Sequence, residues 1–418
     1  MLDQAEDQRP IDETAPLLNR VNSDDNKLRI FIAYVLTLLN CLFSASFTVF
    51  SLYSVAFENK LNYTPLEVNY VSIAAEMGLY LCVPVLGYLA DATNLGYLGI
   101  IGSVTSAIGY SACAMVVRNQ ASYIWMGVSF AIVGVSCSAI FISCLVHCAR
   151  LYPHSATLAI ATPTAVYGIS SLLYAQLISW QLNSGVELSS LFFQLAWLLT
   201  IVGLLQALAP IIGNVRQDTI VRETPTEERS NIKKFFHSKR TLICLLSFVL
   251  VSGPLEMYQN NVGLMAKTIG SKTSTATQVA LFSSFSTFSR LFVGGLADVF
   301  KFKPPVIMLS VLCVLALSDL LLAIKSIPLS IGSAISGFGY GSSFTLYPLM
   351  VAKVWGLERF ATYWGLFILG PAFGSFAFGL LFAVDLQWSN NYTLALAGCS
   401  FAFALSVYIL YQLKFHRL

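Results

Sequence analysis

The stretch Arg290-Leu-Phe-Val-Gly-Gly-Leu-Ala-Asp298 ends in the pattern Gly-x-Leu-Ala-Asp, which also occurs at Gly87-Tyr-Leu-Ala-Asp91. The two copies of the pattern begin 207 residues apart. A second pair of landmarks, Ala156-Thr157 and Ala361-Thr362, recurs at the similar offset of 205 residues. Nearly equal offsets indicate that the chain consists of two related halves.

The composition shows which solvent surrounds these halves. Of the 418 residues, 56% are apolar and only 11% are charged, and the mean hydropathy is +0.71. Soluble globular proteins carry roughly 25% charged residues, so charge cannot cover the surface of this chain. The composition excludes a soluble enzyme and a nucleic-acid binder, and it indicates a protein embedded in lipid.

Long apolar runs predict the number of transmembrane helices, because one crossing takes about 20 residues. Six runs precede a polar, charged segment and six follow it. We therefore predict an all-α membrane protein with 12 transmembrane helices in two pseudo-symmetric six-helix bundles. The predicted spans are 30–56, 67–90, 96–117, 121–148, 155–179, 190–212, 241–268, 275–299, 304–325, 328–352, 360–384 and 392–413.

Basic residues predict the orientation of these spans. With a cytosolic N-terminus, 18 of the 24 lysines and arginines lie on the cytosolic side, five lie on the other side and Arg290 lies within a span. This bias follows the positive-inside rule and places both termini in the cytosol. The two N-x-[ST] sequons, at Asn62 and Asn391, both fall on the far side, where glycosylation occurs.

These patterns divide the chain into five parts. We expect a disordered cytosolic tail, an N-terminal bundle, a cytosolic linker, a C-terminal bundle and a short cytosolic tail. Their predicted boundaries are 1–29, 30–212, 213–239, 240–413 and 414–418.

The repeated Gly-x-Leu-Ala-Asp pattern and the six-plus-six topology resemble the major facilitator superfamily. Within it, residues 290–298 resemble the monocarboxylate-transporter group, and the stretch Ser252–Gly263 resembles fungal monocarboxylate-transporter homologues of the vacuolar membrane and nodulin-like proteins. The resemblance implies the major facilitator fold, with Gly87, Asp91, Gly294 and Asp298 as gate residues. Basic residues usually follow the first copy of the motif, but here Asp91 is followed by Ala-Thr-Asn-Leu, so the usual aspartate–arginine latch lacks its local partner.

Charged groups inside the membrane are costly and often functional. Arg290 precedes Asp298 by eight residues, which places it roughly 12 Å inside the helix end. A guanidinium there needs an acidic partner, either a substrate carboxylate or a fixed ion pair with Glu256 or Asp319. Glu256 lies beside Pro254 in a stretch that also contains Asn260, a polar cluster typical of a binding site or of helix packing.

Four further residues complete the predicted substrate and coupling set. Glu76 is a candidate for proton coupling, because a buried carboxyl group can take up a proton at moderate pH, or else it is a hydrogen-bonded packing residue. Asp319 is a weaker candidate, because the helix that contains it is peripheral in the resembling superfamily. Asn40 and Tyr167 are candidates to line the cavity.

The tail contains Glu13-Thr-Ala-Pro-Leu17-Leu18, which matches the acidic dileucine pattern E-x-x-x-L-L. This pattern predicts recognition by a clathrin-type adaptor and resembles vacuolar and lysosomal sorting signals. The nine cysteines all fall within predicted spans and are interpreted as packing residues. We expect no metal site and no cofactor.

The sequence therefore predicts a secondary transporter, working as a monomer, that moves a small organic solute across the vacuolar membrane by alternating access. Arg290 favours a carboxylate solute, and the buried acids favour a proton symporter. The alternative is a membrane sensor on the same fold, although such sensors carry a long cytosolic tail and this chain ends at Leu418. The spans show no paired aspartates, metal motif or Ser–His arrangement, so we do not expect an enzyme.

Overall fold

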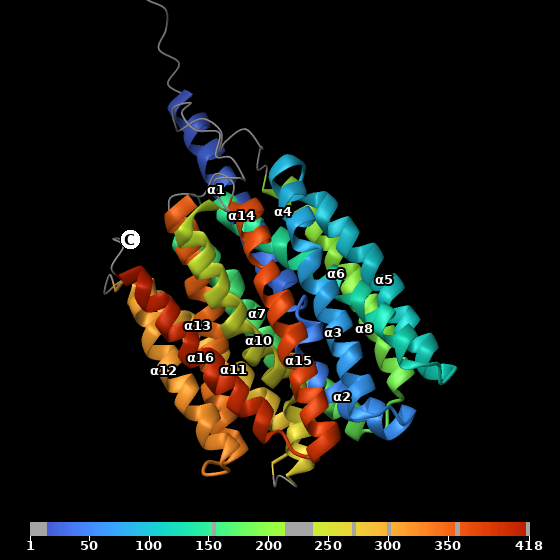
Figure 1. Cartoon of the computed structure of the whole chain (residues 1–418). Coiled ribbons are helices and arrows are strands. Elements are labelled where there is room, and N and C mark those ends of the chain that lie inside the picture. Colours follow the sequence, from blue (N-terminus) through green and yellow to red (C-terminus); the bar gives the residue numbers. More distant parts are fainter. Residues whose placement is uncertain are drawn as a thin grey trace, which may run out of the picture.

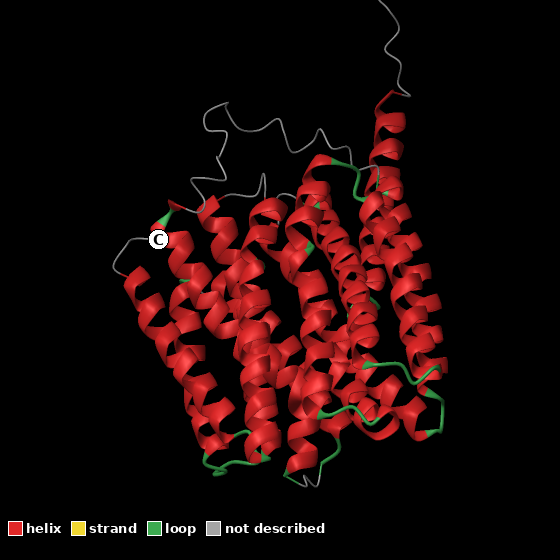
Figure 2. Ribbon diagram, turned by 45° about the vertical axis from the view of Figure 1, so that its right-hand side comes forward, coloured by secondary structure: helices red, strands yellow, loops and turns green. Residues whose placement is uncertain are grey.

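The protein forms a bundle of long, roughly parallel rods, as seen in its computed structural model (Figure 1). The structure describes residues 15–152, 156–213, 237–269, 273–298, 302–355 and 360–414. Among these residues the regular elements are all helices (Figure 2). The side chains at 15–26, 156–161, 298, 353 and 413–414 lie outside the description.

The first half of the chain supplies six rods, four of them unbroken helices. The elements are α1 (Ala15–Leu42), η1 (Ser46–Val49), α2 (Phe50–Leu61), α3 (Pro65–Leu81), α4 (Val83–Ala92), α5 (Gly96–Arg118), α6 (Tyr123–Leu151), α7 (Ala156–Asn183) and α8 (Leu188–Ile212). The first rod contains α1, η1 and α2, and the second contains α3 and α4.

The second half repeats this arrangement. Its elements are α10 (Lys239–Thr268), α11 (Thr275–Asp298), α12 (Pro304–Ala323), α13 (Leu329–Trp355), α14 (Phe360–Phe367), α15 (Leu369–Ser389) and α16 (Thr393–Lys414). Within the described residues, ten helical rods are long and apolar enough to cross a membrane, and α7 and α13 occupy the other two predicted spans. The all-α fold with twelve rods is confirmed.

One boundary differs from the prediction. Helix α1 begins at Ala15, so the backbone of residues 15–29, predicted as disordered tail, is helical. The apolar span nucleates this helix, and each residue added to an existing helix gains a hydrogen bond without a new nucleation cost.

The rods are interrupted at three places. In the first rod, the hydroxyl groups of Ser44 and Thr48 donate hydrogen bonds to the carbonyl oxygens of Cys41 and Ala45, at 2.8 and 2.6 Å. Such local bonds compete with helical ones, and the backbone turns through η1. In the second rod α3 ends at Leu81, three residues before Pro84, and in the eleventh rod α14 ends at Phe367, four residues before Pro371. The ring of a proline clashes with the preceding turn of a helix, which explains both interruptions.

The halves pack against each other in a symmetric way. Helix α7 of the N-terminal bundle contacts α11, while α3 and α4 contact α15 and α14. The two contacts are equivalent in the internal repeat. Helix α7 of the first half corresponds to α14 and α15 of the second half, and α11 corresponds to α3 and α4. A third interface, between α2 and α10, maps onto itself.

Two ends of the molecule are distinguished below. The linker end is where α8 ends and α10 begins, and it also contains the end of α4 and the start of α14 (upper end in Figure 1). The loop end is the opposite one, where α2 is followed by α3.

Candidate functional site

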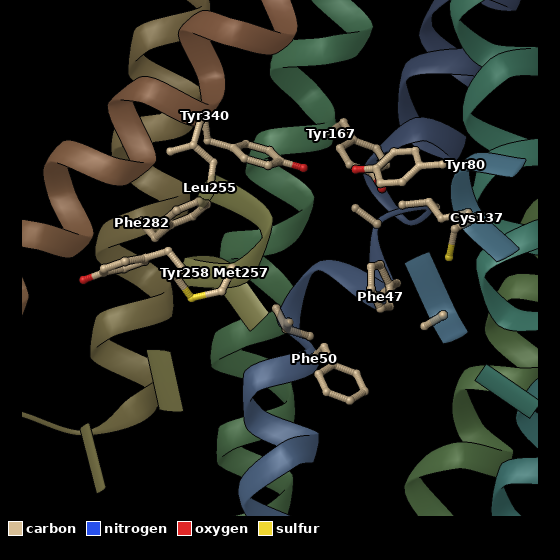
Figure 3. Packing of buried hydrophobic residues seen from close by; sticks show 14 of the residues in the cluster. Phe47, Phe50, Tyr80, Cys137, Tyr167, Leu255, Met257, Tyr258, Phe282 and Tyr340 are labelled. Carbon is tan, nitrogen blue, oxygen red and sulfur yellow. The ribbon is translucent and has the colours of Figure 1, made fainter. Parts of the chain in front are cut away.

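A cavity lies between the two bundles and is lined by residues of both. Tyr80 and Tyr167 line it from the N-terminal bundle, and Glu256, Arg290 and Tyr340 line it from the C-terminal bundle. Figure 3 shows Tyr340 extending from one side towards Tyr167 and Tyr80 on the other. The symmetric packing of the halves thus leaves a polar centre at the middle of the interface.

The rest of the cavity wall is mostly apolar and aromatic. Phe47 and Phe141 line it from the N-terminal bundle, and Phe344 and Trp364 line it from the C-terminal bundle. The ring of Tyr167 lies 4.6 Å from that of Phe141, centroid to centroid. A ligand that fits this cavity needs an apolar body with few polar groups.

Arg290 contributes the positive charge of the cavity. Its side chain is 3% exposed, and its Nη1 atom donates a hydrogen bond across the interface to the carbonyl oxygen of Thr164 on α7. Its Cζ atom lies 5.9 Å from the centre of the Tyr340 ring. Among the described residues no carboxylate forms an ion pair with it within 4.0 Å, and its Nε atom has no hydrogen-bond partner. The fixed ion pair considered from the sequence, with Glu256 or Asp319, is therefore not formed in this structure.

Glu256 accepts hydrogen bonds from both bundles. The hydroxyl group of Tyr80 on α3 donates to its Oε1 atom, and the hydroxyl group of Tyr340 on α13 donates to the same atom at 3.2 Å. Next to it on α10, the Nε2 atom of Gln259 donates to the carbonyl oxygen of Thr48 in η1, at 3.0 Å. Helix α10 runs unbroken past Pro254, so this polar cluster sits on a continuous helix.

Glu76 lies on α3, one turn before Tyr80, and is 2% exposed. Its Oε1 atom accepts a hydrogen bond from the Nδ2 atom of Asn260 on α10. The Oδ1 atom of Asn260 is buried without a hydrogen-bond partner. Each of the two acids therefore accepts a hydrogen bond from the opposite bundle, and Glu256 accepts one from its own bundle as well.

The other predicted residues occupy different places. Tyr167 lines the cavity. Asn40 lies inside the N-terminal bundle, where its Nδ2 atom donates to Gln206 on α8 at 3.0 Å. Asp319 is buried on α12, away from the cavity lining, and its Oδ1 atom has no hydrogen-bond partner in the described structure. The structure thus brings five of the seven candidates together and leaves Asn40 and Asp319 elsewhere.

Two polar residues of this site, Tyr80 and Tyr340, were missed from the sequence. Tyr80 lies four residues after Glu76, which places both on one face of α3. Tyr340 lies in the run Gly337-Phe-Gly-Tyr-Gly341, whereas Gln259 belongs to the polar stretch around Glu256 that the sequence had indicated. The spacing of four residues from Glu76 on the same helix is the signal that could have identified Tyr80. In the described part of the chain, no three histidine, cysteine or acidic side chains group as metal ligands.

The first copy of the repeated motif joins the bundles at the linker end. The Oδ2 atom of Asp91 accepts hydrogen bonds from the backbone nitrogen and the hydroxyl group of Thr362, at 3.0 and 2.7 Å. Arg150 on α6 lies 3.8 Å from the same carboxylate. It replaces the missing basic residue of the local turn. A Cβ atom added to Gly87 would lie 2.4 Å from the carbonyl oxygen of Ala361, so only glycine allows this approach of α4 to α14.

The second copy is packed differently. A Cβ atom at Gly294 would meet nothing within 4 Å, and the side chain of Asp298 lies outside the described residues. At the loop end, the Nζ atom of Lys267 on α10 lies 2.5 Å from the Oε2 atom of Glu58 on α2. The bundles are thus in contact on both sides of the cavity.

The structure describes the predicted glycosylation residues but not the side chains of the predicted sorting residues. Glu13 lies outside the described residues, and Leu17 and Leu18 belong to α1 with their side chains not described. Asn62 is exposed directly after α2, and Asn391 lies between α15 and α16. Both sequons are at the loop end, as the predicted topology requires.

Comparisons with known proteins agree with the architecture. The family model of the Major Facilitator Superfamily matches residues 35–379. Three fungal relatives carry the name probable transporter MCH1. The relative from Wickerhamomyces anomalus is 31% identical over 84% of this chain and 79% of its own length. Those from Yarrowia lipolytica and Saccharomyces cerevisiae are each 32% identical over 84% of this chain. The matched region spans 82% of the first relative's length and 83% of the second's. The chain belongs to the major facilitator superfamily.

Proposed function

We propose that this chain is a proton-coupled secondary transporter that moves a small organic carboxylate across the vacuolar membrane by alternating access. One observation carries the substrate class: Arg290 is buried in the cavity between the bundles and has no carboxylate partner among the described residues. A permanently charged guanidinium in a low-dielectric interior is costly unless an anion neutralises it. A solute carboxylate can do so through charge-assisted hydrogen bonds.

The arrangement of the bundles supports alternating access. The cavity lies between two related halves, and separate contacts close it at each end: Asp91 with Thr362 at the linker end, and Lys267 with Glu58 at the loop end. A solute at the centre can leave only when one of these contacts opens, which is the requirement for transport by rocking of two bundles. The fungal relatives bear the name of probable transporters, in agreement with this activity.

The location and orientation belong to the same proposal. The excess of lysine and arginine at the linker end supports a cytosolic position for that end and for both termini. The dileucine motif at Glu13, Leu17 and Leu18 supports delivery to the vacuole through a clathrin-type adaptor. We further propose that Asn62 and Asn391 face the lumen as acceptors for glycosylation.

Uptake into vesicles tests the function. Vacuole-derived vesicles from overexpressing and deletion cells are supplied with a panel of radiolabelled organic acids, with and without a proton gradient. We expect gradient-dependent uptake of at least one carboxylate in the overexpressing vesicles. Replacing Arg290 by alanine should raise KM about 10- to 100-fold, because each charge-assisted hydrogen bond contributes about 1.5–3 kcal/mol.

Arg118 offers a matched control. It lies at the end of α5, with its Cζ atom 4.9 Å above the ring of Phe193 and away from the cavity. Arg118→Ala should leave KM unchanged. Retained KM in Arg290→Ala would contradict the carboxylate anchor. Binding of an organic acid by the purified protein without uptake of any compound would favour the membrane sensor instead.

A further inference from the structure

Two helices from different bundles hold each other by reciprocal hydrogen bonds at the centre of the molecule. Glu76 and Tyr80 are four residues apart on α3, and Glu256 and Asn260 are four residues apart on α10. Tyr80 donates to Glu256, and Asn260 donates to Glu76. We call these four residues the carboxyl clamp. Each bundle contributes one acid and one donor.

The opposite directions of the two helices explain this pattern. Helix α3 runs from the loop end to the linker end, and α10 runs the other way. Residues at positions i and i+4 of a helix share one face. The acid of each antiparallel helix therefore faces the donor of the other.

All four side chains are shielded from water. Glu76, Tyr80, Glu256 and Asn260 are between 1% and 4% exposed. A hydrogen bond to a charged group in such surroundings is stronger than one in water, and its loss is correspondingly large. The protonation state of the two carboxyl groups therefore determines how firmly α3 is held to α10.

Protonation changes what each carboxyl group can do. An ionised carboxylate only accepts hydrogen bonds, whereas the protonated acid carries an O–H donor and has less capacity to accept. The Oε1 atom of Glu256 accepts from both Tyr80 and Tyr340, so a proton bound there removes the charge that strengthens both bonds. At the other acid, a proton on Oε2 of Glu76 leaves Oε1 able to accept from Asn260, and the new O–H can donate to the unpartnered Oδ1 atom of Asn260, so this contact is kept.

Other groups face the clamp from the neighbouring helices. Arg290 on α11, Tyr340 on α13 and Tyr167 on α7 line the same cavity as Tyr80 and Glu256. Ser375 on α15 interacts with Glu76. Arg290 is the charged group among them, so an anion bound to Arg290 and a proton bound to the clamp favour each other electrostatically.

We propose that the carboxyl clamp is the proton-binding site of the protein, and that a proton bound to Glu256 weakens its bond to Tyr80, loosens α3 from α10 and lets the bundles move apart. In this step one O–H bond of a hydronium ion breaks, one O–H bond forms on the carboxylate oxygen, and a water molecule is left. Tyr80 and Asn260 act as positioning residues, because their hydrogen bonds to the carboxyl groups link the protonation state to the distance between the bundles. This inference rests on the proposed proton-coupled function, but it makes a separate claim about conformation.

Distances between the bundles test the clamp without any solute. The full-length protein is placed in lipid nanodiscs, with Cys82 and Cys313, the two native cysteines that are not buried, replaced by serine. Spin-label pairs are introduced at each end for double electron–electron resonance. The loop-end pair is Ser184→Cys with Ser326→Cys, and the linker-end pair is Ala92→Cys with Gln412→Cys; all four positions are exposed.

In the otherwise unaltered protein, lowering the pH from about 8 to about 5, across the range in which carboxyl groups titrate, should increase the widely separated population at one end. Tyr80→Phe keeps the ring and removes the donor, so the wide population should already rise about tenfold at the higher pH. Glu256→Gln cannot bind the proton and should show no change with pH.

Tyr258→Phe is the matched control. The hydroxyl group of Tyr258 bonds to Ser333 at 3.1 Å, inside the C-terminal bundle, so this variant should follow the unaltered protein. The clamp would be refuted if Tyr80→Phe and Glu256→Gln kept the normal pH response, or if Tyr258→Phe altered it equally. Failure of every organic acid to be transported would overturn the substrate proposal and leave these distances unaffected. Transport with pH-independent distances would overturn the clamp alone.

Discussion

At the scale of single residues, the arginine and the two acids of the cavity differ from the other buried polar groups in what they contact. Arg290, Glu76 and Glu256 each interact with the opposite bundle. Asn40 donates a hydrogen bond to Gln206 of its own bundle, and Asp319 has a carboxyl oxygen without a partner among the described residues. A polar group that stabilises one bundle and a group that joins two bundles should respond differently to substitution.

Asn40 tests the first of these roles. Replacing Asn40 by leucine leaves the Oε1 atom of Gln206 without its donor, and Gln206 in turn donates to Ser143 at 3.2 Å. We expect a loss of about 1–3 kcal/mol in stability, because a buried acceptor stays unsatisfied. A lower melting temperature in detergent, with unchanged KM for uptake, would confirm a packing role. A KM change as large as that of Arg290→Ala would place Asn40 in the transport path.

Asp319 provides a second test at this scale. A buried carboxyl oxygen without a partner is costly, and asparagine has the same shape without the charge. We expect Asp319→Asn to keep or raise the melting temperature and to leave the dependence of uptake on the proton gradient unchanged. Loss of that dependence would make Asp319 a coupling residue after all.

Sequence reasoning found the charged part of this site because charge in an apolar span is rare. It could not separate Asn40 and Asp319 from the cavity residues, since a span shows which residues are buried but not which bundle interface they face. It also missed Tyr80 and Tyr340, because tyrosine is common in membrane helices and only the contact with Glu256 distinguishes these two.

At the scale of helices, eleven of the twelve spans were predicted to within about five residues, because hydropathy records where the chain crosses lipid, and the first helix begins earlier than predicted, at Ala15. The interruptions at Ser46–Val49 and at Ile368 were not predicted. Hydroxyl groups and prolines cause these interruptions, but whether such a residue interrupts its helix depends on how the neighbouring helices pack against it. Pro254 illustrates this, since α10 continues past it. Gly253 packs there against the backbone of Gly374 on α15, so the helix pairing stabilises the continuous form.

The two copies of the motif give a matched comparison of helix packing. Gly87→Ala places a Cβ atom 2.4 Å from the carbonyl oxygen of Ala361, whereas Gly294→Ala meets nothing within 4 Å. We expect the first variant to separate α4 from α14 and to reduce the maximal uptake rate by roughly tenfold or more, as overpacking by 1–3 kcal/mol implies. The second should transport normally. Equal effects in both variants would show that close packing at Gly87 does not matter for the transport cycle.

At the scale of the whole molecule, the chain is a multi-pass transporter of the major facilitator superfamily in which different chemistry closes the two ends. A carboxylate caps a helix start at the linker end, and a lysine–glutamate pair closes the loop end. The internal repeat predicted two facing bundles correctly. It could not predict this difference, since equivalent positions in the two halves have diverged.

The loop-end pair should contribute only modestly. The side chain of Lys267 is 54% exposed, and exposed ion pairs contribute about 0–1 kcal/mol. We therefore expect Glu58→Gln to change the ratio of separated to closed loop ends by no more than about fivefold. The spin-label pair at Ser184 and Ser326 measures this ratio. A much larger shift would show that this pair, and not the cavity residues, holds the bundles together.

Solute counterflow in proteoliposomes tests the central claim most directly. Vesicles containing the purified protein are loaded with an unlabelled carboxylate that vacuolar vesicles take up, and a trace of the labelled compound is added outside without a proton gradient. Alternating access through a cavity anchored by Arg290 predicts a transient accumulation of label, which is lost in Arg290→Ala and kept in Arg118→Ala. Label that equilibrates without accumulating, or accumulation that survives Arg290→Ala, would contradict the account.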